Sequence, residues 1–167
     1  MVCIDPGING CGVAFFSESG KLTGACYVRA PASEFEVSAV SMRVKLMAEA
    51  VLKIIGEDPS RLLVTERPQI YTWGKGKGDL NQLIPLAEVC AFIAARWGGP
   101  WATVSPREWK GTIDGDAMTE RIMERLTREE FKNIVRAGKT VDHNVFDAIG
   151  IGLGKFGRLA KERVIAR

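Results

Sequence analysis

The sequence predicts an α/β fold with a mixed five-stranded sheet, in which three antiparallel strands precede two parallel ones and helices cover both faces. Two observations predict this fold class. Short apolar segments separated by turn residues fill residues 1–29, as in a series of hairpin-connected strands. Farther along, short apolar segments alternate with patterns of helical period, as in parallel strands joined by crossover helices. No internal repeat or boundary is visible, so we expect a single domain over residues 1–167.

The first three predicted strands span residues 2–4, 12–16 and 22–29. The first strand ends at the turn sequence Asp5-Pro6-Gly7. The sequence ESGK at residues 18–21 suits a hairpin turn between the second and third strands. Three antiparallel strands follow from this pattern.

A long helix and a fourth strand come next. The capping-box pattern Ser33-x-x-Glu36 begins the helix, and Gly56 ends it. Between them apolar residues recur at steps of three and four, namely Val37, Val40, Val44, Met47, Val51 and Ile54. Residues 62–65 form the fourth strand, and Glu66 stands at its end.

The remaining elements complete the predicted crossovers. A helix covers residues 80–95, and we expect Pro85 to break or kink its start. Residues 102–104 form the fifth strand. Three further helices follow at residues 117–126, 127–137 and 142–160, the second of them capped by Thr127-x-x-Glu130. In this topology the first strand lies centrally, beside the fourth.

Composition excludes several classes of protein. Hydrophobic residues make up 46% and charged residues 26% of the 167 positions, which is typical of a globular domain and not of a disordered chain. The longest apolar run, residues 89–95, is too short to span a membrane, and the first residues lack a signal-peptide pattern. The four cysteines have no C-x-x-C spacing, so we expect no zinc site or disulfide framework and a reducing cytoplasm.

The net charge of +3 neither requires nor excludes a nucleic-acid partner. Basic residues gather in residues 67–77 and in residues 155–167. We leave open whether this last group, which contains Arg158, Lys161, Arg163 and Arg167, faces DNA or is an ordinary solvated helix end.

Three carboxylates stand where the predicted topology would bring them together. Asp5 and Glu66 follow neighbouring strands, and Asp147 lies among apolar residues of the last helix. Mg²⁺ or Mn²⁺ would neutralise such a cluster, and two such ions support phosphodiester cleavage. Structural alternatives remain: Asp5 in an Asx-turn, Glu66 paired with Arg67 or Lys110, and Asp147 paired with a buried arginine.

The start of the last helix offers further polar groups. His143 lies one turn before Asp147 and shares its helix face, as does Asn144. His143 is either part of the site or a surface residue. Asp142 suits an N-cap role, although it could also curl into the site.

Several ordered motifs resemble those of RuvC-type Holliday-junction resolvases of the RNase H-like superfamily, and phage-encoded members in particular. They are IDPG at residues 4–7 with GCGV at 10–13, VTE at 64–66, VSPREWK at 104–110 and DHNVFDA at 142–148. The resemblance implies an RNase H-like nuclease domain that resolves branched DNA in recombination and repair. It also implies a location in the cytoplasm of a bacterium or of a phage-infected host.

Carried over by position, the resemblance makes Asp5, Glu66 and Asp147 ligands of two Mg²⁺ or Mn²⁺ ions. The family's fourth ligand stands three residues before the last aspartate, where this chain has Asn144, so either His143 or Asp142 takes its place or the start of the helix is reshaped. Lys110 matches the lysine near the scissile phosphate, and Arg121 is a candidate for a second basic residue.

Candidate DNA contacts follow the fourth and fifth strands. The resemblance places an aromatic side chain at Gln69, so Tyr71 and Trp73 are expected to stack on bases instead, or to pack on Arg67 or Pro68. Phosphate contacts are expected from Arg67, Lys75, Lys77, Arg107 and Lys110, with a merely solvated loop as the alternative for the two lysines after Trp73. The sequence GKGKG lacks the phosphate-loop pattern, so no nucleotide cofactor is expected.

A four-way junction has two-fold symmetry, so we expect a homodimer. By resemblance it would form through residues 80–95, where Ala87, Ala91, Ala94 and Ala95 would allow close approach or would simply pack on the sheet. Two other functions stay open: a non-catalytic module that binds branched DNA, and an RNA–DNA hybrid nuclease of the same fold.

Overall fold

The computed structural model describes residues 1–29, 39–69, 80–138 and 141–159. Its centre is a five-stranded sheet in the order β3-β2-β1-β4-β5. The strands are β1 (Val2–Asp5), β2 (Cys11–Phe16), β3 (Leu22–Val28), β4 (Leu63–Glu66) and β5 (Trp101–Val104). The first three strands pair antiparallel, whereas β1 with β4 and β4 with β5 pair parallel. This confirms the predicted mixed sheet, with β1 at its centre.

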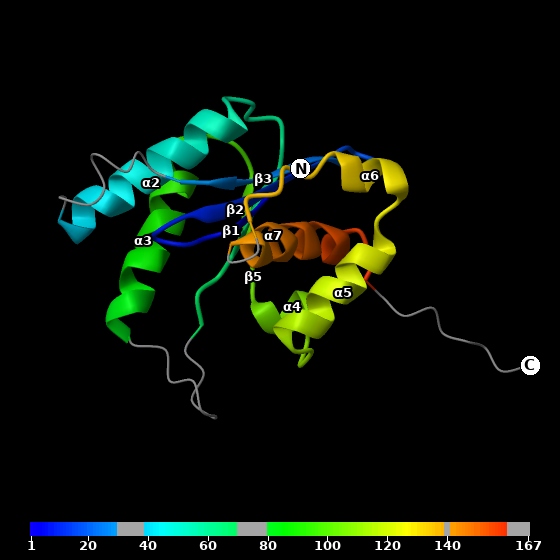
Figure 1. The fold of residues 1–167 in the computed structure, drawn as a ribbon. Coiled ribbons are helices and arrows are strands. Elements are labelled where there is room, and N and C mark those ends of the chain that lie inside the picture. The colour runs from blue at the N-terminus through cyan, green and yellow to red at the C-terminus, as the bar shows by residue number, and fades with distance from the viewer. Residues whose placement is uncertain (30–38, 70–79, 139–140, 160–167) are drawn as a thin grey trace, which may run out of the picture.

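Helices cover both faces of the sheet (Figure 1). On one face lie α2 (Val40–Ile55) and α3 (Leu80–Trp97), and on the other lies α7 (Asp142–Lys155). Strand residues alternate between the two resulting cores. Ile4 packs with α2 and α3, and its neighbour Cys3 packs with α7. In the described residues no helix is both long and apolar enough to cross a membrane.

The α2 helix is shorter than its apolar pattern predicts. Val44, Met47 and Val51 are buried as expected. Val40 and Ile54 are 44% and 48% exposed, because the buried stripe begins only at Val44 and passes through Ile55 instead of Ile54 at the end of the helix. The helix ends at Gly56, whose φ of 70° suits glycine. The predicted capping box at residues 33–36 lies outside the described residues.

The α3 helix runs from Leu80 to Trp97 through Pro85, so of the predicted break or kink the break is not formed. A proline removes only one backbone hydrogen bond, here near the helix start, and the rest of the helix continues to Trp97. The buried face of α3, which includes Val89 and Ile93, packs toward the sheet and α2.

Beyond β5, the chain forms three short helices before α7. These are α4 (Pro106–Trp109), α5 (Gly115–Arg125) and α6 (Arg128–Lys132). The sequence did not predict α4. The capping box predicted at Thr127 and Glu130 is confirmed.

The α6 helix ends well before residue 137, where the prediction placed its end. The chain leaves the helix because residues 133–135 pair with the edge of β3 at Ala25. The Ala25 N–H donates to the carbonyl of Asn133 at 3.0 Å, and the Val135 N–H donates to the carbonyl of Ala25 at 2.8 Å. The last helix also ends early, at Lys155 instead of residue 160, and Gly157 follows with a φ of 69°.

The first turn of α7 rests directly on the backbone of β2. A Cβ atom built on Gly12 would lie 1.8 Å from the carbonyl oxygen of Asn144, so only glycine fits there. Gly12 pairs with Asp5 in the sheet. This contact therefore fixes how closely the start of α7 approaches the end of β1.

We expect Gly12→Ala to lower the free energy of unfolding by about 3 kcal/mol or more, because the added methyl group meets backbone that cannot rotate away. Chemical denaturation would measure the change. Gly115→Ala is the matched control, since a Cβ at Gly115 meets nothing within 4 Å. Equal stability of both variants would contradict the close contact.

Candidate active site

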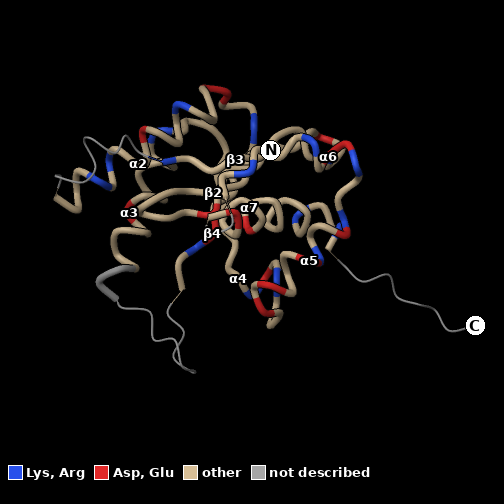
Figure 2. Tube along the Cα trace, viewed as in Figure 1, with Lys and Arg blue, Asp and Glu red and all other residues tan. Residues whose placement is uncertain are grey.

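Two acidic residues meet at the carboxyl edge of the sheet, where Figure 2 shows acidic positions beside α7. Asp5 is the last residue of β1, and Glu66 is the last of β4. Cys3 pairs with Val64 in the parallel ladder, and both pack in the core under α7. Two residues later, Asp5 and Glu66 therefore lie side by side and face α7. The structure thus brings together the two strand-end acids that the sequence predicted.

Asp147 of α7 completes the acidic cluster. Burial raises the pKa of Asp5 well above its ordinary value, and the negative charges of Glu66 and Asp147 raise it further, while Lys110 lowers it. Burial is also the main cause of the raised pKa of Glu66 and of Asp147. Each acid is therefore costly to ionise in this crevice unless a cation compensates it.

Lys110 is the cationic side chain that faces this cluster. Its Nζ atom lies 3.7 Å from Oδ2 of Asp147 and 5.0 Å from the ring centre of Trp109. Asp147 is thus partnered by a lysine and not by the buried arginine of the structural alternative. The Asx-turn suggested for Asp5 is not formed, because the Gly7 N–H donates to Cys11 Sγ at 3.4 Å.

Trp109 is a member of the site that the sequence analysis did not single out. Its indole N–H donates to Oε2 of Glu66 at 2.6 Å. The α4 helix aims it inward: Pro106 opens the helix, and Glu108 accepts from the N–H of Ser105 at 2.6 Å to close the capping box. The signal available was its place beside Lys110 in the VSPREWK segment.

The two candidates for a fourth metal ligand, His143 and Asp142, have different surroundings at the start of α7. His143 is exposed, and its charge lowers the pKa of Asp147 on the same helix face. Asp142 is buried and accepts from Arg136 Nε at 2.6 Å and from the N–H groups of Ala137 and Gly138 at 2.9 and 3.2 Å.

The predicted N-cap role of Asp142 is wrong. Val141 occupies the cap, and Asp142 is the first helical residue, with its carboxylate turned back to the preceding segment. Burial alone would raise the pKa of Asp142, but its bonds to Arg136 and to the Ala137 N–H hold it below its ordinary value. Both of its oxygens are therefore already engaged.

The chemistry of the cluster suits a divalent cation. Asp5, Glu66 and Asp147 offer hard oxygen ligands and more negative charge than Lys110 neutralises, which fits Mg²⁺ or Mn²⁺. Within the described parts of the chain, no three Asp, Glu, His or Cys side chains are already close enough together to hold a metal ion. The three carboxylates therefore fit a divalent ion by the type and charge of their oxygen atoms, but they are not yet close enough to surround it.

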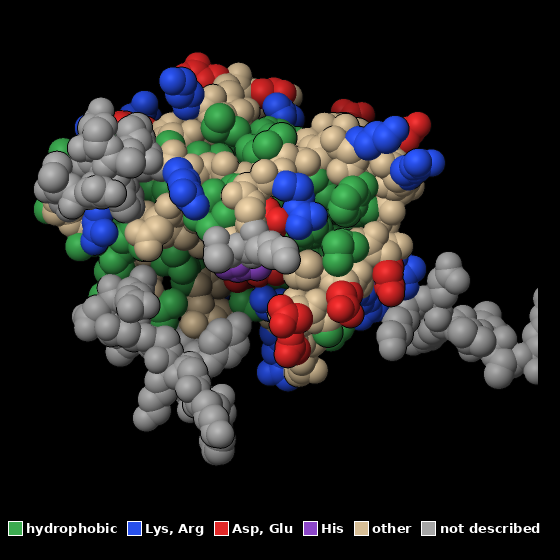
Figure 3. Space-filling view, in the orientation of Figure 1, with side chains coloured by type: hydrophobic (Ala, Val, Ile, Leu, Met, Phe, Trp, Pro, Cys, Tyr) green, Lys and Arg blue, Asp and Glu red, His purple; other side chains and the backbone are tan. Residues whose placement is uncertain are grey.

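Predicted DNA contacts lie partly around this crevice. Arg67 and Arg107 are exposed beside the site, at the start of the loop after β4 and in α4. In Figure 3, histidine and acidic side chains share a recess, next to Lys and Arg side chains. Tyr71, Trp73, Lys75 and Lys77 lie outside the described residues.

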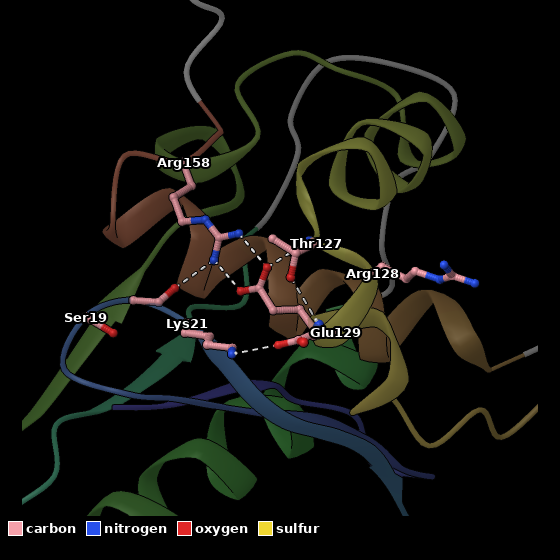
Figure 4. A pocket seen from close by; sticks show the side chains of 8 residues that line it. Ser19, Lys21, Thr127, Arg128, Glu129 and Arg158 are labelled. Atoms are coloured by element: carbon pink, nitrogen blue, oxygen red, sulfur yellow. Dashed lines mark hydrogen bonds and ion pairs between the residues drawn. The ribbon is translucent and has the colours of Figure 1, made fainter.

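Two other basic residues singled out in the sequence, Arg121 and Arg158, make structural contacts. Arg121 Nη2 donates to the carbonyl of Leu159 at 2.6 Å. Arg158 is half-buried and pairs with the buried Glu130, with its two terminal guanidinium nitrogens 2.6 and 2.8 Å from the carboxylate oxygens (Figure 4). It also donates to the carbonyls of Gly20 and Arg125. Lys155, at the end of α7, is exposed, and Lys161, Arg163 and Arg167 lie outside the described residues.

A cavity of about 600 Å³ lies beside the pair of Arg158 and Glu130 and not at the acidic cluster. It is lined by Ser19, Gly20, Lys21, Thr127, Arg128, Glu129, Glu130 and Arg158. Its Ser19–Lys21 wall is the β2–β3 turn, which lies at the opposite end of β1 from Asp5, because Val2 pairs with Phe15. This cavity is therefore separate from the candidate active site.

No family model and no curated protein sequence matches this chain. Solved structures do match, and they show that the chain has the RuvC-type, RNase H-like fold. Thermus thermophilus RuvC in complex with a Holliday junction substrate is 16% identical over 92% of each chain, with a TM-score of 0.62. Another structure of T. thermophilus RuvC is 18% identical over 95% of this chain and 98% of its own, with a TM-score of 0.58. The predicted fold and the resemblance to RuvC-type proteins are confirmed at the level of the fold.

Asp5→Asn should stabilise the metal-free protein. The folded pKa of Asp5 is raised above its ordinary value of 3.8, so its contribution to stability is fully present below that pH and is lost as the pH rises through the folded pKa. We expect the melting temperature of Asp5→Asn in EDTA to exceed that of the parent by at least about 2 °C at alkaline pH. The advantage should vanish near pH 4, and an advantage independent of pH would contradict this account.

Glu130→Gln should lower the free energy of unfolding by about 2 kcal/mol at pH 7, because it leaves the half-buried guanidinium of Arg158 without its counter-charge. The pKa of Glu130 is lowered from 4.5 to about 2, mainly by its bond to Arg158, so its stabilising effect is present above 4.5 and fades as the pH falls toward 2. The difference between variant and parent should shrink over that range. Glu129→Gln is the control, since its ion pair with Lys21 is exposed and worth less than about 1 kcal/mol.

Proposed function

We propose that this chain is a metal-dependent endonuclease that resolves Holliday junctions and other branched DNA by phosphodiester hydrolysis. The convergence of Asp5, Glu66 and Asp147 with Lys110 at the carboxyl edge of the sheet carries this proposal. The fold supports it, because a solved structure of the same fold is T. thermophilus RuvC in complex with a Holliday junction substrate.

Asp5, Glu66 and Asp147 are the residues proposed to hold two Mg²⁺ or Mn²⁺ ions. Bound ions of this kind activate a water molecule and stabilise the leaving oxygen of the phosphodiester. Asp5 is proposed to serve both ions, since the charges of both Glu66 and Asp147 act on it. His143 is favoured over Asp142 as the additional polar group, because the oxygens of Asp142 are engaged by Arg136 and the backbone of residues 137–138.

Lys110 supplies positive charge within the crevice. Its ammonium group lies between the carboxylate of Asp147 and the face of Trp109, where it is only partly exposed. A point charge held there favours a phosphate that gains negative charge in the transition state. In the metal-free protein the same ammonium group partly offsets the repulsion among the acids.

The proposed DNA surface begins at the rim of this crevice. Arg67 and Arg107 are exposed there and suit sequence-independent contacts to phosphates. Base stacking by Tyr71 or Trp73 and phosphate contacts by Lys75 and Lys77 remain part of the same proposal. Such an enzyme would act in the cytoplasm of a bacterium or of a phage-infected host.

A second copy of the chain is proposed to provide the second cut that a two-fold symmetric junction requires. Ala87, Ala91 and Ala95 of α3 are exposed, so they do not pack on the sheet, and Ile84 is 58% exposed beside them. These residues follow one another along the helix at steps of three and four. This face suits close packing against the same face of another copy.

The purified protein should nick a synthetic four-way junction when Mg²⁺ or Mn²⁺ is present, and Asp5→Asn should slow cleavage at least about 100-fold while junction binding persists. Gel assays of cleavage and of binding measure both effects. Asp58→Asn, at a partly exposed position before β4 where the carboxylate pairs with Arg61, is the matched control and should cut like the parent.

Each other outcome contradicts the proposal in a recognisable way. Binding without cleavage in any metal identifies a non-catalytic junction-binding module. Cleavage of RNA–DNA hybrids in preference to branched DNA identifies a hybrid nuclease. Full activity of Asp5→Asn removes Asp5 from the metal assignment.

A further inference from the structure

We propose that Trp109 is a positioning residue that holds the carboxylate of Glu66 in one orientation for metal binding. The inference rests on the proposed function, because it assumes that Glu66 is a metal ligand. Its physical basis is the indole N–H of Trp109, which donates to Oε2 of Glu66 at 2.6 Å.

In the hydrogen bond between Trp109 and Glu66, only the tryptophan can be the donor. An indole N–H donates and cannot accept, so Oε2 of Glu66 must act as the acceptor. Trp109 is only 7% exposed, so water does not compete freely for the N–H group. A donor held against a carboxylate in these surroundings gives a strong, charge-assisted bond. It occupies one oxygen of Glu66 and leaves the other, Oε1, to face a ligand.

Trp109 is itself held in place by α7. A Cβ built on Gly150 would lie 2.3 Å from Cζ3 of Trp109, and one built on Gly154 would lie 3.2 Å from its Cβ. These two glycines are one turn apart, so they open a shallow groove in α7 that receives the indole. The same helix carries Asp147. The indole therefore links the position of Glu66 on the sheet to the position of Asp147 on the helix.

The ring of Trp109 also contacts the cation of the site. Lys110 Nζ lies 5.0 Å from the ring centre, within range of a cation–π interaction, and 3.7 Å from Oδ2 of Asp147. One side chain thus touches both Glu66 and Lys110. A tryptophan that served only to fill the core would need neither contact.

Trp109→Phe tests the proposal, because phenylalanine keeps an aromatic ring beside Lys110 and removes the N–H group. Trp97→Phe is the matched control: Trp97 is 4% exposed and also donates its indole N–H, but to the carbonyl of Arg61, away from the acids. Both variants lose one buried indole hydrogen bond, so both are expected to lose similar stability.

The primary measurement is Mn²⁺ binding without DNA, followed through the electron paramagnetic resonance signal of free Mn²⁺. We expect Trp109→Phe to weaken Mn²⁺ affinity about 10- to 100-fold, as the loss of a bond that orients a ligand does, and Trp97→Phe to change it less than about twofold. In a Glu66→Gln background, Trp109→Phe should have no further effect, because its effect acts through Glu66.

Three results would overturn the proposal: unchanged Mn²⁺ affinity in Trp109→Phe, equal losses in the two tryptophan variants, or an undiminished loss when Glu66 is already Gln. The outcome is separate from the fate of the proposed function. If the parent protein binds Mn²⁺ but cuts no branched DNA, a selective loss in Trp109→Phe still supports the positioning role. If the parent binds no Mn²⁺, the role assigned to Trp109 is wrong.

Discussion

The backbone of α7 touches the sheet at Gly12, and the position of Asp147 relative to Asp5 and Glu66 depends on that contact. Gly12 pairs with Asp5, so the helix that carries Asp147 is held over the end of β1. A side chain at Gly12 would clash with the backbone of α7 at Asn144. Gly150 of α7 also lacks a side chain, and this leaves room for the indole of Trp109. The glycines at these two contacts therefore help to set the distances among the polar groups of the crevice.

This close packing imposes an electrostatic constraint. It removes Asp5, Glu66 and Asp147 from water and places their charges near one another, which disfavours ionisation of all three. Lys110 and the N–H of Trp109 offset only part of this cost. The crevice is thus less stable than an apolar core of the same size would be. Such local instability is the usual sign that a site is shaped for a ligand rather than for folding.

Local sequence patterns predict most of the fold and the three acids, because turn residues and strand ends are local features. Asp5 and Glu66 stand out since each follows a short apolar strand. Trp109 escapes notice because its contact with Glu66 spans 43 residues and depends on α4, a helix of four residues. Arg158 looks like a surface residue in the sequence, yet it pairs with Glu130 through an arrangement of three distant segments. Periodicity carries no information about such pairings.

The bond from Arg158 to the carbonyl of Gly20 joins residues 138 positions apart, and α7 lies just before Arg158 in the chain. During synthesis on the ribosome, α7 emerges after every strand of the sheet. A nascent chain that already contains Asp5 and Glu66 therefore still lacks Asp147 and the helix that covers the sheet. Asp5 and Glu66 remain exposed to solvent, and without Asp147 beside them, until α7 docks. The order of translation thus delays assembly of the crevice until the fold is nearly complete, so a partly made chain carries no assembled acidic cluster.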